Sequence, residues 1–96
     1  MKLENYTIKY RVHALKRMFE RTISDDEVVT VLESGETINE YPDDTPYPSK
    51  LMKGTVSDRV LHVLIAENIP ENEIVVITVY EPDPNLWDSE FRRKLK

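Results

Sequence analysis

Hydrophobic residues follow first a two-residue period and then a helical period in the N-terminal part of the chain. Tyr6, Ile8 and Tyr10 occupy alternate positions, which predicts a short strand or extended lead-in over residues 5–10. From residue 11 to residue 22 the period is helical, and one side of a helical wheel gathers five hydrophobic residues: Val12, Ala14, Leu15, Met18 and Phe19. The pattern predicts an amphipathic helix with this side as its apolar face.

A second helix is predicted directly after the first. Ser24 and Glu27 have the spacing of a capping box, and acidic residues occupy the turn that follows the serine. Val28 to Leu32 continue the helical pattern, and Gly35 is a natural C-terminal stop. Two consecutive helices therefore precede the long strands.

After Gly35 the hydrophobic period becomes that of strands. Strands are predicted over residues 36–41, 51–56, 60–66 and 74–80, with a three-proline loop over 42–48, a turn at 57–59 and a hairpin connection at 68–72. Residues 85–96 are compatible with a short helix held down by Trp87. The order predicts an α+β fold in which two N-terminal helices pack on one face of a three- to four-stranded antiparallel sheet. We expect a single domain of residues 1–96 with a C-terminal tail from about residue 84.

Charge is distributed unevenly along the 96 residues. The net charge is −5, but residues 1–21 carry six Lys or Arg against two Glu, whereas residues 22–91 carry three against sixteen acids, and the last five residues add four positive charges. Nucleic-acid affinity comes largely from neutralising phosphates, so no DNA contact is predicted for this chain alone. Contact with RNA would use the first helix or the basic tail, and a basic protein partner would use the acidic middle.

Several classes of protein are excluded by what the sequence lacks. There are no cysteines, which rules out disulfides and cysteine-based zinc sites and fits a reducing cytoplasm. The two histidines have no metal-binding spacing, and no glycine-rich phosphate loop is present. No apolar run is long enough to span a bilayer. We therefore expect a cytoplasmic protein that uses no metal, no cofactor and no membrane.

The first candidate for chemistry is a ladder of basic residues on the first predicted helix. His13, Arg17 and Arg21 lie four positions apart, so their side chains follow one stripe of the helix surface. The stripe could grip a phosphate with an imidazole at one end, or it could be an ordinary solvated face. Arg21 flanks the apolar edge and is expected to be partly buried, with His13 in solvent.

His62 is the second candidate, because it interrupts an apolar strand. Strand alternation places it on the face opposite Leu61 and Val63. It is either a half-buried histidine hydrogen-bonded to a neighbour, or an imidazole that enters a cleft and transfers protons. Tyr80 ends the last strand and offers a phenol, and Tyr47 beside the proline loop either stacks on a nucleobase or packs under the loop.

Four segments together resemble the domain-of-unknown-function family 4258, a set of small prokaryotic proteins: HALKRMFERTI at 13–23, GETINEYPDD at 35–44, LHV at 61–63 and TVYEPD at 78–83. The resemblance extends from about residue 6 to residue 87. One departure is Thr22, where relatives usually carry glycine, and it affects the turn between the helices. The family is similar in layout to the RelE-like and BrnT-like toxins, whose helices lie on one face of a small antiparallel sheet.

The resemblance implies a metal-independent endoribonuclease of the RelE-like toxin type, with RNA as substrate and a small antitoxin protein as partner. A base would then activate the ribose 2′-OH while arginines stabilise the charged phosphorane. In this chain His62 and His13 would transfer protons, Tyr80 would be an extra donor, and Arg17 and Arg21 would hold the phosphate. The alternative is a non-catalytic protein-binding module that keeps the same fold.

Overall fold

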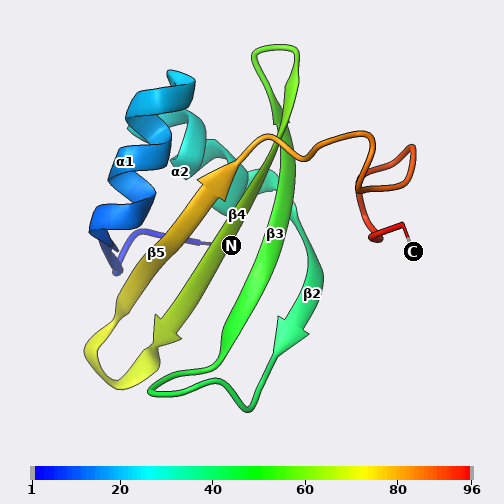
Figure 1. Ribbon diagram of the computed structural model, residues 1–96. Helices are drawn as coiled ribbons and strands as arrows, with labels where there is room; N and C mark the ends of the chain where they lie inside the picture. The colour runs from blue at the N-terminus through cyan, green and yellow to red at the C-terminus, as the bar shows by residue number, and fades with distance from the viewer. Residues whose placement is uncertain (1, 96) are drawn as a thin grey trace.

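The computed structural model describes residues 2–95 and places two helices beside a five-stranded sheet (Figure 1). Along the chain the elements are β1 (Thr7–Tyr10), α1 (Val12–Arg21), α2 (Asp25–Ser34), β2 (Glu36–Tyr41), β3 (Ser49–Val56), β4 (Arg59–Asn68), a short 3-10 turn (Ile69–Glu71) and β5 (Glu73–Tyr80). The predicted helices and strands are confirmed, with strands β3 and β4 longer than their hydrophobic runs. Neither helix is long and apolar enough to cross a lipid bilayer, within residues 2–95.

The sheet is mixed, and the prediction of three to four antiparallel strands was wrong. Its strand order is β1-β5-β4-β3-β2, and β1 pairs with β5 in parallel while the other neighbours are antiparallel. The alternation in residues 5–10 marked a strand but carried no information about its partner, because strand pairing depends on segments distant in sequence. In this sheet the first and last strands lie side by side.

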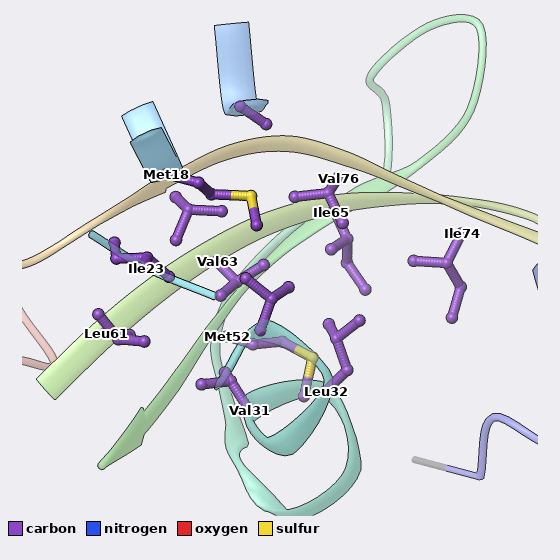
Figure 2. Packing of buried hydrophobic residues seen from close by; sticks show 13 residues of the cluster. Met18, Ile23, Val31, Leu32, Met52, Leu61, Val63, Ile65, Ile74 and Val76 are labelled. Atoms are coloured by element: carbon purple, nitrogen blue, oxygen red, sulfur yellow. The ribbon is translucent and has the colours of Figure 1, made fainter. Parts of the chain in front are cut away.

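One face of the sheet and both helices share a hydrophobic core (Figure 2). The helices contribute Ala14, Met18, Val28, Val31 and Leu32. Strands β3 and β4 contribute Met52, Leu61, Val63 and Ile65, which alternate along β4 as the strand period requires. Strand β5 contributes Ile74, Val76 and Val79, and its period shifts after Val76, where the pairing with β4 is irregular. The placement of Leu61 and Val63 on the core face confirms the predicted alternation of β4, and it turns His62 to the other face.

The two helices begin and end at residues whose chemistry accounts for their bounds. Ser24 and Glu27 form the predicted capping box, in which the serine Oγ accepts from the Glu27 amide at 3.1 Å and the Glu27 carboxylate accepts from the Ser24 amide at 3.0 Å. Gly35 ends α2, and its amide donates to the Val31 carbonyl at 2.8 Å. Between the helices Thr22 has a φ of 54°, in the left-handed region.

The C-terminal segment, residues 83–95, contains no helix, so the short helix considered there was wrong. It folds as turns that close on themselves, with a bridge between Trp87 and Lys94 and a bond of 2.8 Å from the Leu95 amide to the Leu86 carbonyl. Figure 1 shows this segment, coloured orange to red, on the side of the sheet away from α1. Pro82 and Pro84 follow the end of β5, and the residues after them are too few for a stable isolated helix.

Candidate functional site

His62 is completely buried under the C-terminal segment, on the sheet face opposite the core. Its Nε2 lies 2.7 Å from the carbonyl oxygen of Phe91, and its Nδ1 lies 3.1 Å from the hydroxyl of Tyr80. The Trp87 ring packs edge-on against the imidazole, with ring centroids 4.5 Å apart. The ring is therefore surrounded on every side that would otherwise face solvent.

These contacts determine which ring nitrogen of His62 carries the hydrogen and whether the ring is charged. A carbonyl only accepts, so Nε2 carries the hydrogen and Nδ1 accepts from the Tyr80 hydroxyl. Burial lowers the pKa of His62 below its usual 6.5, against the opposing effect of the Phe91 carbonyl, and the nearby Lys53 ammonium lowers it further. Burial also raises the pKa of Tyr80, with a smaller contribution from Tyr41. Both groups are neutral at neutral pH.

Lys53, His62 and Tyr80 form a row across three strands. Lys53 of β3 pairs in register with His62, and His62 pairs with Tyr80 of β5. The Lys53 ammonium donates to the carbonyl of Glu90, the residue before Phe91. Two successive carbonyls of the C-terminal segment thus accept from Lys53 and His62, so the single N–H of the neutral imidazole is already used.

His13 is exposed on α1 and lies on the other side of the sheet from His62. The residues of α1 that reach the sheet are Ala14 and Met18, and both belong to the core on the face that His62 does not share. The two histidines are therefore not brought together. A shared role in proton transfer has no geometric basis, because both groups must reach one substrate within hydrogen-bonding distance.

The two ladder arginines lie on the exposed surface of α1. Arg17 faces Glu20 one turn further on, with 3.7 Å between the charged atoms, which is a weak surface pair. The Arg21 side chain is exposed rather than partly buried, contrary to the prediction. Its main-chain carbonyl accepts a hydrogen bond from Arg59, so the end of the helix is held by its backbone while its side chain extends into solvent.

Tyr47 lies at a separate cleft of about 390 Å³, which is formed where β3 begins and β4 ends. Its hydroxyl accepts from the Asn68 side chain at 3.1 Å, so the tyrosine is tied to β4 beneath the proline loop. Lys50 and Glu67 line the same cleft and pair with each other at 2.6 Å. The structure thus places Tyr47 apart from the histidines and from the arginine ladder.

Three residues that were predicted to lie on the apolar face of the first helix are exposed. Val12, Leu15 and Phe19 of α1 are 82%, 50% and 88% exposed. They lie three and four positions apart, so they form one continuous line along the helix, which we call the α1 ridge. The prediction failed because α1 contacts the sheet through a narrow stripe, and the rest of its wide apolar side is left uncovered. The sequence contained a signal for this exposure: the apolar side of the first helix is wider than the stripe that contacts the sheet.

The chain was compared with protein families, with curated proteins and with solved structures. The family model "Domain of unknown function (DUF4258)" matches residues 10–81. No curated protein and no solved structure matches.

Proposed function

This chain belongs to the DUF4258 family of domains of unknown function, a membership that assigns no activity, and from its geometry we propose a protein-binding module that docks its partner on the α1 ridge. The observation that carries the proposal is the exposure of Val12, Leu15 and Phe19 on one line of a helix. Single exposed apolar residues are common on proteins, whereas adjacent large ones mark interaction sites. Covering the Phe19 side chain alone would contribute about 1.5–3 kcal/mol.

The charges around the ridge define the chemistry of the partner. Lys16 lies beside the ridge, and the basic ladder follows on the outer surface of α1, where Glu20 is the single acid. No ion pair joins Arg11, Lys16 or Arg21 anywhere in residues 2–95. Residues 22–91 are strongly acidic, so they repel an acidic partner and direct it to α1. The occupant is therefore an amphipathic helix with an apolar stripe and acidic flanks, as a small antitoxin-like protein would supply.

Ribonuclease activity, which the family resemblance implied, stays a prediction, and the geometry supports it less. His62 and Tyr80 are occupied by each other and by the C-terminal segment, and His13 lies across the sheet. Arg17 and Arg21 belong to the same surface as the α1 ridge. Growth arrest on expression of the wild type that is lost in Arg17→Ala but retained in the ridge variant Phe19→Ser would favour RNA cleavage over the binding module.

The test uses the full-length chain and three labelled helical peptides, with fluorescence anisotropy as the readout. One peptide has a leucine stripe with glutamate flanks, the second has lysine flanks, and the third replaces the leucines with serine. We expect the glutamate-flanked leucine peptide to bind, and Phe19→Ser to weaken binding about tenfold or more, because covering this large side chain supplies much of the apolar contact. Ile69→Ser is the matched control, since Ile69 is 65% exposed on a different surface.

Three outcomes would overturn this proposal. The first is equal binding of the glutamate- and lysine-flanked peptides, which would remove the charge argument. The second is an unchanged affinity in Phe19→Ser. The third is a stable homodimer of the wild type that Phe19→Ser dissociates, which would make a second copy of the chain the occupant of the α1 ridge.

A further inference from the structure

The C-terminal segment is attached to the sheet through a few side-chain contacts rather than through a strand ladder. Its carbonyls at Glu90 and Phe91 accept from Lys53 and His62, and the Arg92 guanidinium pairs with Glu36 of β2 at 2.8 Å. The Trp87 ring is buried against the imidazole. His62 is the centre of this attachment, because it makes one of the carbonyl contacts and the ring contact.

The segment is also closed on itself, so it can leave the sheet as a unit. The Asp88 amide donates to the Arg93 carbonyl at 2.9 Å, and Asp88 accepts from the amides of Glu90 and Arg92 through its carboxylate. These bonds lie within residues 83–95 and do not depend on the sheet. Detachment therefore breaks the contacts to Lys53, His62 and Glu36 and leaves the internal turns intact.

We propose that residues 83–95 form a pH-dependent latch, which stays on the sheet while His62 is neutral and detaches when the His62 imidazole takes a second proton. The second proton would place a positive charge in a completely buried position. Detachment returns the imidazole to water. It also uncovers Lys53 and Tyr80 and releases the basic residues at the end of the segment.

The groups around His62 offer no negative charge to stabilise the protonated ring. From β3 it faces the Lys53 ammonium and from β5 the neutral Tyr80 phenol. From the C-terminal segment it faces the Phe91 carbonyl and the Trp87 ring. The carboxylates of the surrounding elements have other partners: Glu36 pairs with Arg92 and Lys53, Glu90 pairs with Arg92, and Asp88 accepts from the backbone of its own turn.

The direction of the pH effect follows from the two states of the ring. In the detached state His62 is in water and titrates near its usual value of 6.5, whereas burial lowers its pKa in the attached state. The detached state therefore binds more protons as the pH falls below that value. Attachment of the C-terminal segment is therefore fully favoured above pH 6.5 and weakens toward acidic pH.

The experiment follows the ¹⁵N-labelled full-length chain by NMR between about pH 8 and about pH 5, a range in which histidine titrates and most carboxylates stay ionised. It records the His62 ring titration together with the backbone heteronuclear NOE of residues 83–95. We expect the His62 ring to titrate below the usual histidine value of 6.5, and the NOE values of the segment to fall with the same midpoint as His62. The heteronuclear NOE values of the β4 and β5 amides should stay constant over the same pH range.

Two variants separate His62 from other titrating groups. His62→Gln keeps an N–H for the Phe91 carbonyl and does not titrate, so its C-terminal segment should stay rigid throughout the range. His13→Gln makes the same change at the other histidine and should behave as the wild type. A rigid segment in the wild type after the His62 ring has been protonated would overturn the latch. So would loosening of the segment in a folded His62→Gln chain over the same pH range. If His62→Gln does not fold, the shared midpoint in the wild type decides alone.

Discussion

At the scale of single residues, Thr22 holds the connection between the helices in a conformation that suits glycine. Its φ of 54° and ψ of 50° lie in the left-handed region, where a Cβ meets the backbone. The amide of Thr22 still donates to Phe19 at 3.4 Å, and the next amide, of Ile23, donates to Met18 at 2.8 Å. The end of α1 is thus well bonded, but a β-branched residue occupies its most strained position.

We predict that Thr22→Gly stabilises the protein by about 1 kcal/mol, because the left-handed strain it removes exceeds the extra freedom that glycine gains in the unfolded chain. Thr22→Ala is the matched control, since it keeps the Cβ and should gain little. Urea unfolding followed by the single tryptophan measures both. A midpoint that rises equally in the two variants would show that the threonine side chain, and not its backbone conformation, is unfavourable.

At the scale of elements, Arg59 joins α1, α2 and β5. Its guanidinium donates to the main-chain carbonyls of Arg21 and Thr22 at 3.0 and 2.7 Å. It also pairs with Glu27 at 3.0 Å and with Glu81 at 2.9 Å. The Ser24 amide is the main reason that the pKa of Glu27 lies below its usual range, and Arg59 adds to this effect. A residue predicted only as part of a turn therefore holds the ends of three elements.

We predict that Arg59→Met destabilises the fold by about 2–3 kcal/mol, because the Glu27 and Glu81 carboxylates and two helix-end carbonyls lose a charged donor. Arg59→Lys should recover only part of this, since one ammonium cannot replace the planar fork. Chemical denaturation gives the values, with the exposed Arg93→Met as control. An unfolding midpoint of Arg59→Met equal to that of Arg93→Met would contradict the role assigned to Arg59.

At the scale of the whole molecule, positive charge is concentrated in residues 1–21 and in the last five residues, and negative charge in the residues between them. Residues 1–21 carry an excess of positive charge, and residues 22–91 carry a much larger excess of negative charge. Such a field attracts an acidic partner to the basic parts of the molecule, α1 among them, and repels it from the acidic middle of the chain, and it acts on the rate of association.

We predict that the association rate of the glutamate-flanked peptide falls about tenfold between about 0.05 M and about 0.5 M salt, because screening shortens the range of the field, while the dissociation rate changes little. Lys16→Glu should slow association at low salt and reduce its salt dependence. Stopped-flow anisotropy measures both rates. A salt-independent association rate would mean that the α1 ridge binds through apolar contact alone.

The local elements were determined by the sequence itself. The capping box at Ser24, the stop at Gly35 and the β-branched runs act over a few residues, so their periods identify two helices and four strands without knowledge of the fold. The same alternation placed His62 on the face opposite Leu61. These features depend on backbone geometry, which is the same wherever the element lies.

Only the tertiary structure decided what covers each face. Phe19 and Met18 are neighbours on the same helix, yet Met18 is buried and Phe19 is exposed, because coverage depends on where α1 lies against the sheet. The pairing of β1 with β5 and the burial of His62 by residues 83–95 likewise join segments distant in sequence. Hydrophobic periodicity states which residues can be buried, whereas the packing of distant segments determines which of them are.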